Sequence, residues 1–61
     1  MTIAEMTGQE MAERMGSDAT EAEGEKFREM LIDAGYEQSE SDSIPESTWL
    51  RIMDESIIAT A

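Results

Sequence analysis

The chain contains no cysteine and no histidine, and only four of its 61 residues are Lys or Arg. Without cysteine it can form neither a disulfide framework nor a thiolate metal site. Without histidine it lacks the commonest general base and metal ligand, so that a Ser or Thr nucleophile would have no imidazole partner. The composition therefore argues against an enzyme, and we expect a protein that works by binding, without a cofactor or a metal.

Long apolar runs are also missing, because no stretch approaches the roughly 20 apolar residues that are needed to cross a bilayer. The N-terminal stretch MTIAEMTGQEMAERMG has neither the basic region nor the apolar region of a signal peptide. We therefore expect a single domain over residues 1–61, in the cytoplasm and away from membranes. A domain of this length is near the lower limit for folding without a metal or disulfides.

Acidic residues, by contrast, are abundant: fifteen Asp and Glu give a formal net charge of −11. Such a chain is repelled by nucleic acid and by anionic membranes, so direct contact with either is not expected. Basic protein surfaces would attract it, and the commonest of these are nucleic-acid-binding grooves. Two plainer explanations stay open, because acidity also confers solubility and can reflect a salt-adapted host.

Three amphipathic segments predict an all-α fold, a compact bundle of three short helices at about residues 8–15, 19–34 and 45–58. Strands are not expected, because the chain has no Val and no run of alternating apolar residues. Ile3, Ala4 and Met6 are expected to cover one end of the core, and Trp49 to lie at its centre.

Capping patterns mark where the first two helices begin. Thr7 and Glu10 have the spacing of a capping box, and Gly16 suits a left-handed residue after the first helix. Either Ser17 or Asp18 is expected to cap the second helix.

Two glycines in the second segment need an explanation. Gly24 lies near the apolar face, where it predicts either close approach of another helix or a kink. Gly35 predicts a Schellman ending that brings Tyr36 to Leu31. The polar stretch 37–43 that follows is expected to be a solvated loop, without the spacing of a calcium site.

The third helix is expected to begin after a cap at Ser43 or Ile44, with Pro45 in its first turn. Its apolar face is predicted to comprise Trp49, Leu50, Ile52, Met53 and Ile57. Near its end, Ile57 and Ile58 either complete the core or stay exposed as a surface for self-association.

Acidic residues recur at every fourth position of the second segment and its continuation, at Glu21, Glu25, Glu29, Asp33 and Glu37. On a helix this spacing places them in one row opposite the apolar face, with Ile32 inside it. Lys26 and Arg28 are expected to relieve part of the repulsion, which amounts to roughly 0.2–0.5 kcal/mol per pair. We expect these acids and Ile32 to bind a partner.

Three kinds of binding protein fit this pattern. The acidic row can occupy the Lys and Arg side chains of a nucleic-acid-binding groove and block it. An acidic antitoxin-like protein that neutralises a basic toxin or repressor would use the same electrostatics. An adaptor would instead bind through its Met and Ile side chains, and salt would weaken that binding less.

Two stretches resemble a known family. Residues 12–19 and 49–56 read AERMGSDA and WLRIMDES, and they resemble small phage-encoded anti-CRISPR proteins, the type I-E inhibitors in particular. The resemblance runs from about Glu10 to Ser56, whereas the segment 38–45 and the ending IIATA depart from it.

The resemblance implies an inhibitor made in the bacterial cytoplasm during phage infection, acting as a monomer or a homodimer. It would bind the type I interference machinery, either the RNA-guided complex Cascade or the helicase-nuclease that Cascade recruits, and block DNA binding or cleavage. Both targets have basic nucleic-acid channels. The resemblance assigns no contact residue in this chain.

Overall fold

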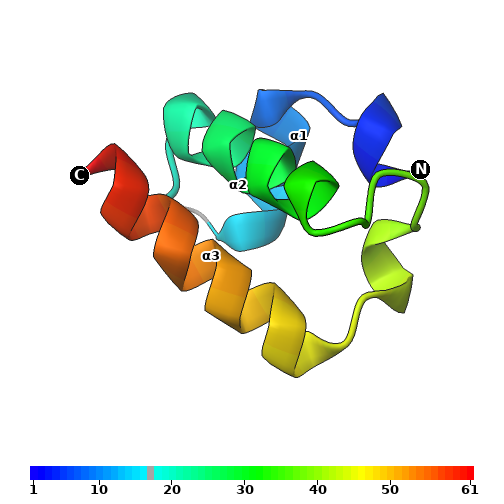
Figure 1. The fold of residues 1–61 in the computed structure, drawn as a ribbon. Helices are drawn as coiled ribbons and strands as arrows, with labels where there is room; N and C mark the ends of the chain where they lie inside the picture. The colour runs from blue at the N-terminus through cyan, green and yellow to red at the C-terminus, as the bar shows by residue number, and fades with distance from the viewer. Residues whose placement is uncertain (17) are drawn as a thin grey trace.

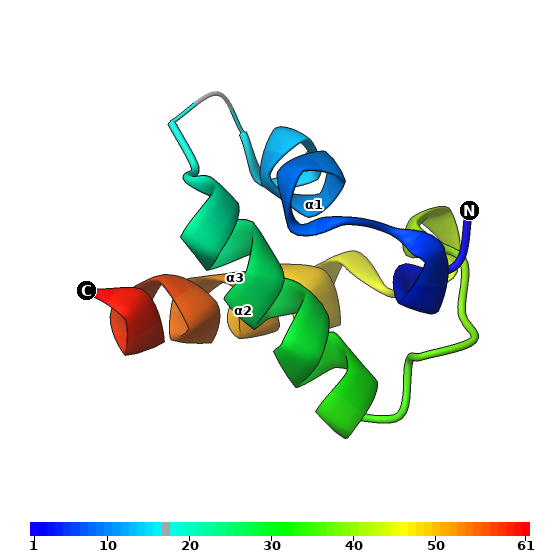
Figure 2. The same cartoon turned by 90° about the horizontal axis from the view of Figure 1, so that it is seen from above.

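The computed structural model describes residues 1–16 and 18–61. It is all-α, with helices α1 (Gly8–Met15), α2 (Glu21–Asp33) and α3 (Glu46–Thr60) and two single 3-10 turns, η1 (Ile3–Glu5) and η2 (Ser41–Ser43). The central element is α2, which contacts α1, α3 and η1. It crosses over α3 and has α1 at its other side (Figure 1 and Figure 2).

The first helix begins at the predicted capping box. Thr7 Oγ1 accepts a hydrogen bond from Glu10 N at 3.1 Å, and Thr7 N donates to Glu10 Oε1 at 2.9 Å. After the last helical residue, Gly16 has φ 139° and ψ 169°. This conformation favours glycine, but it lies outside the left-handed helical region that the sequence predicts.

The second helix starts two residues later than expected, because its cap is Thr20 and the prediction of Asp18 is wrong. Thr20 Oγ1 accepts from Glu23 N at 3.2 Å, and Thr20 N donates to Glu23 Oε1 at 2.8 Å. Thr and Glu three residues apart satisfy two backbone donors reciprocally, and this pair decides where the helix begins. Ser17, the other predicted cap, lies outside the described residues.

Gly24 allows α1 and α2 to approach within backbone contact, as one of the two predictions for it stated. A Cβ at Gly24 would collide with the carbonyl oxygen of Gly8 and would lie 2.8 Å from the backbone nitrogen of Ala12. Both Gly8 and Gly24 are buried. The glycine therefore gives up helix propensity for a tighter interface between the two helices.

A Schellman motif ends α2, as predicted. The backbone nitrogen of Tyr36 donates to the Leu31 carbonyl at 2.9 Å, and that of Gly35 donates to the Ile32 carbonyl at 3.0 Å. Gly35 has φ 95°, which a residue with a side chain rarely adopts. The motif stops the helix at Asp33 and turns the chain away.

The core lies between α2 and the other elements, and its buried apolar residues are Ile3, Met6, Met11, Phe27, Leu31, Ile44 and Ile52. The burial of Ile3 and Met6 confirms the expected cover at one end. The largest fully buried side chain is that of Phe27, so the prediction that Trp49 is the central residue is wrong. Trp49 is only half-buried and packs edge-on against Phe27, with 4.7 Å between ring centroids and an interplanar angle of 73°.

The third helix spans Glu46–Thr60, so it begins one residue and ends two residues later than predicted. Pro45 occupies the cap position itself, because η2 takes up Ser43 and Ile44 follows it as extended backbone.

The inward face of α3 holds Ile52 and Ser56, both buried, whereas Leu50 and Ile57 are 45% and 38% exposed. Three of the five predicted residues, Trp49, Ile52 and Met53, therefore do belong to the face that contacts the core, and Ser56 is buried there as well.

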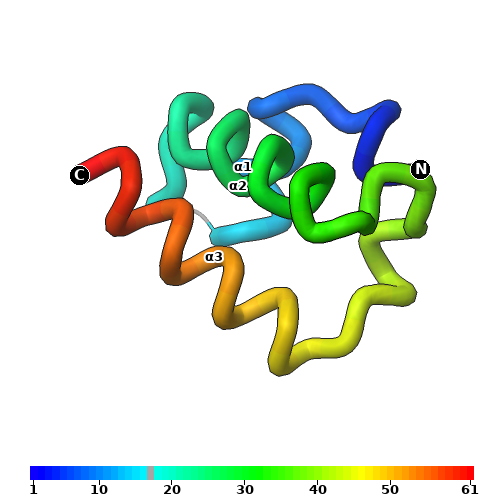
Figure 3. The backbone as a smooth tube through the Cα atoms, in the orientation of Figure 1, coloured from blue at the N-terminus to red at the C-terminus, as the bar shows by residue number. Residues whose placement is uncertain are grey.

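The stretch 37–43 is anchored to the N-terminus, contrary to the expected free loop. Ile3 N donates to the Ser39 carbonyl and Ala4 N to the Glu37 carbonyl, both at 3.0 Å. Thr2 and Glu40 form an antiparallel bridge. Residues 1–5 and 37–43, here termed the N-terminal clasp, run side by side in Figure 3. The polar sequence gives no sign of this pairing, because backbone groups make it.

Candidate protein-binding surface

The acidic row is shorter in the structure than in the sequence. Glu21, Glu25, Glu29 and Asp33 all lie exposed on α2. Glu37 follows the Schellman motif, in a turn outside the helix, so its expected helical alignment with the other acids is wrong. It is exposed, but the four-residue spacing no longer places it on their face.

Glu25 is engaged within the molecule. Its Oε1 accepts a hydrogen bond from Gly8 N at 3.1 Å, across the interface between α2 and α1. Gly8 is the first residue of α1, where unpaired backbone N–H groups and the helix dipole favour a negative charge. One acid of the row therefore stabilises the start of the neighbouring helix, a role that sequence spacing alone does not reveal.

Ile32 lies half-buried against the core cluster rather than as a projecting apolar side chain among the acids. The exposed part of its side chain is the only part that a partner can contact.

The expected cations do not neutralise the row. Arg28 Nη2 donates to the carbonyl of Ala4 at 2.9 Å and so secures η1 to α2 instead of pairing with Glu25. Within residues 1–16 and 18–61, Glu21, Glu29 and Asp33 form no ion pair and accept no hydrogen bond through their carboxylates.

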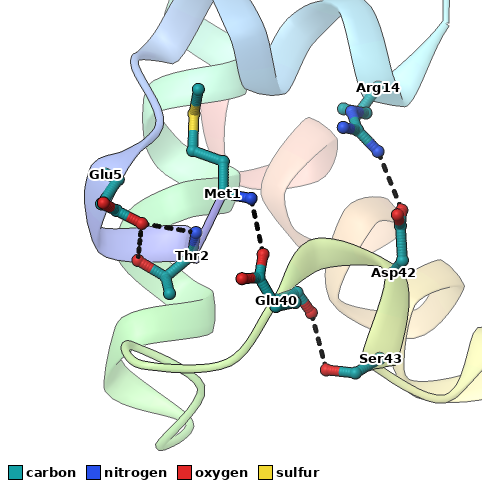
Figure 4. Close-up of polar contacts among 7 residues, drawn as sticks. All are labelled: Met1, Thr2, Glu5, Arg14, Glu40, Asp42 and Ser43. Carbon is teal, nitrogen blue, oxygen red and sulfur yellow. Dashed lines mark hydrogen bonds and ion pairs between the residues drawn. The ribbon is translucent and has the colours of Figure 1, made fainter.

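Ion pairs occur elsewhere on the surface (Figure 4). Arg14 on α1 meets Asp42 of η2 at 2.9 Å, and the Met1 ammonium meets Glu40 at 2.6 Å. The hydrogen bond to Glu40 raises the pKa of the Met1 ammonium above its ordinary value of 8.0. Both pairs join the N-terminal part of the chain to the stretch before α3, and neither involves α2.

A hollow of about 530 Å³ adjoins the acidic row where α1 meets the start of α2. It is lined by Gln9, Ala12, Glu13, Gly16, Ala19 and Glu21. Glu13 and Glu21, from different helices, therefore border one depression with a floor of small residues. Glu13 was absent from the predicted set, because nothing in its local spacing relates it to the row on α2.

Comparison with protein-family models, with curated proteins and with solved structures gave no match. In the described part of the chain, no group of three or more acidic side chains is arranged to hold a metal ion. No helix there combines the length and the apolar character that spanning a bilayer demands. The surface that stands out chemically is formed by the exposed acids Glu21, Glu29 and Asp33 of α2, which we call the acidic face.

Proposed function

We propose that this protein is an inhibitor that binds a basic surface of another protein through Glu21, Glu29 and Asp33. The supporting observation is that these exposed carboxylates have no partner within the described residues, although α2 itself is tightly held. A rigid helix loses little conformational freedom when it binds. The repulsion between the acids in the free protein is relieved when cations of the partner meet them.

The spacing of these acids suits a surface that normally holds a nucleic-acid backbone. Positions four residues apart on a helix are separated by about 6 Å along its axis. Lys and Arg side chains that bind phosphates also form charge-assisted hydrogen bonds with carboxylates. The acidic face thus competes for part of a basic groove without reproducing the shape of a duplex.

The partner that we propose first is the type I CRISPR interference machinery, either Cascade or its helicase-nuclease. This choice rests on the resemblance of residues 12–19 and 49–56 to the anti-CRISPR family and on the basic nucleic-acid channels of both targets. Bound there, the protein blocks the loading or the cleavage of DNA.

A matched pair of charge reversals tests the proposal. Glu29→Lys and Glu55→Lys alter the same side-chain type at exposed helical positions, and both change the net charge equally. With tagged protein and purified type I components, we expect Glu29→Lys to weaken capture at least about tenfold, or 1.4 kcal/mol, and Glu55→Lys to change it little. Adding Asp33→Lys should deepen the loss, and high salt should reproduce it.

Equal losses for the two variants would remove the acidic face from the mechanism and leave only net charge. Capture of a different basic bacterial protein, at the expense of the type I components, would instead favour the antitoxin-like or adaptor function. Salt-resistant capture would favour the adaptor, for which the exposed Ile57 and Ile58 on α3 are the supporting observation.

A further inference from the structure

The end of α1 and the start of α2 face the C-terminal half of α3 (Figure 1). Side chains from these elements line a second hollow, of about 480 Å³. It is lined by Met15, Gly16, Asp18, Ala19, Glu23, Met53 and Ile57. We call it the methionine groove. Its volume is within the range of about 300–1,000 Å³ that is typical of ligand pockets in proteins.

The floor of the methionine groove is apolar and adaptable. Met15 and Met53 are half-buried against the core, and Ile57 leaves 38% of its surface exposed. Unbranched methionine side chains repack readily, which is why they are common on surfaces that bind helices. Leu50 and Ile58, also on α3, are 45% and 74% exposed.

The rim of the methionine groove is acidic. Asp18 is exposed at its edge, and Glu23 lines it while its carboxylate caps α2 through Thr20. At a net charge of −11, a second copy of this chain is repelled from such a rim. A positively charged partner is attracted to it.

We propose that the methionine groove binds an amphipathic helix of a basic protein. Apolar side chains one turn apart on that helix occupy the floor formed by Met15, Met53 and Ile57. Lys or Arg side chains that flank its apolar face meet the acidic rim at Asp18. This mode of binding, an apolar helix face in a groove with charges at its edges, buries the exposed apolar surface of α3.

None of the three acids that the proposed function uses lines the methionine groove, although Glu21 borders the neighbouring hollow, which shares Gly16 and Ala19 with it. Glu29 and Asp33 lie further along α2. The failure of either proposal therefore leaves the other standing, and different variants test them.

The test uses a synthetic peptide of Leu and Lys, roughly 14 residues or four helical turns long, with Leu on one helical face. Methyl NMR of the methionines reports where it binds, because six Met residues provide separate probes. We expect the signals of Met15 and Met53 to shift on titration, while those of the buried Met6 and Met11 stay in place. A peptide of the same composition, scrambled so that it has no apolar face, should leave all of them unchanged.

Variants separate the methionine groove from general charge attraction. Ile57→Asp should lower peptide affinity at least about tenfold, and Asp18→Lys about threefold or more, since Asp18 is exposed and its replacement leaves the fold intact. Glu29→Lys should retain affinity within about twofold. If Ile57→Asp fails to fold by circular dichroism, Asp18→Lys decides the question.

Three results would overturn the proposal. The first is peptide binding without movement of the Met15 and Met53 signals. The second is equal binding of the scrambled peptide, which would indicate attraction by net charge. The third is a shift of the same two signals with protein concentration alone, together with a dimer in sedimentation, which would assign the groove to a second copy of this chain.

Discussion

The two interfaces of α2 are built differently. Against α1 the backbones touch at Gly24, a carboxylate of α2 caps the first turn of α1, and both helices begin with a Thr–Glu box. Against α3 the ring of Phe27 packs on that of Trp49, Pro45 provides no side-chain cap, and Ile57 and Ile58 are left exposed. The α1–α2 pair is fixed by geometry that few sequences satisfy, whereas α3 is fixed by apolar burial.

This difference separates the parts of the molecule that hold its shape from those that are free to bind. At the α1–α2 interface one acid of the predicted row, Glu25, is already bonded to the backbone of α1. The apolar side chains of the last turns of α3 still face water, and burying them is favourable by about 25 cal/mol per Å². Four predictions test this contrast, beginning with the variant that we expect to lose the most stability.

Phe27→Ala should cost about 3–5 kcal/mol of unfolding free energy, because it removes the fully buried ring between the two interfaces. A chain of this size has only about 3–9 kcal/mol in total, so the variant should lose at least about a third of its stability. Urea denaturation followed by circular dichroism measures the loss. Ile58→Ala, at a 74% exposed position of α3, should change the midpoint little. Comparable losses in the two variants would contradict the contrast.

Gly24→Ala should destabilise the protein by about 1–3 kcal/mol, although alanine in an open helix gains up to about 1 kcal/mol over glycine. The new methyl group collides with the backbone of α1 and forces the helices apart. Glu29→Ala, an exposed change on the same helix, should stay within about 0.5 kcal/mol. A stabilised Gly24→Ala protein would mean that the two backbones do not touch.

Thr20→Ala should cost about 1 kcal/mol, because it removes the hydroxyl that accepts from Glu23 N. Asp18→Ala should cost much less, since Asp18 is exposed and does not cap α2. Denaturation midpoints of the two variants measure the difference. The reverse order would restore Asp18 as the cap.

The smallest effect concerns pH. Hydrogen bonds from the backbone and side chain of Thr2 lower the pKa of the Glu5 carboxyl below its ordinary value of 4.5. A folded pKa below the unfolded value contributes stability that is present above the unfolded value and is lost as pH falls through the folded one. NMR titration should therefore place the Glu5 midpoint below the ordinary value of 4.5. Thr2→Val, which keeps the backbone donor, should return it part of the way, and an unchanged midpoint would exclude the hydroxyl.

Local patterns in the sequence predict much of this fold. The capping box at Thr7, the Schellman motif at Gly35 and the buried faces around Phe27 and Leu31 depend on residues within one or two turns of each other. Short stretches of sequence are therefore enough to predict these three features. The close approach at Gly24 is also visible in the sequence, because a glycine on an apolar helix face requires a packing reason.

Contacts between distant residues set the limit of this prediction. The engagement of Glu25 by Gly8, the pairing of Ile3 with Ser39 and the burial of Ser56 depend on how the helices meet. The candidate site in the structure differs from the predicted one for the same reason. The row of acids on α2 is visible in the sequence, but which of them are already occupied is decided across the α1–α2 interface.

The N-terminal clasp has a mechanical consequence. Its backbone hydrogen bonds join residues 3 and 39, so α1 and α2 lie inside a closed loop of chain and α3 lies outside it. Tension applied between the two ends of the chain passes through the clasp directly into α3. The C-terminal helix would therefore unravel first under load, while the other two helices remain shielded from the force until the clasp gives way.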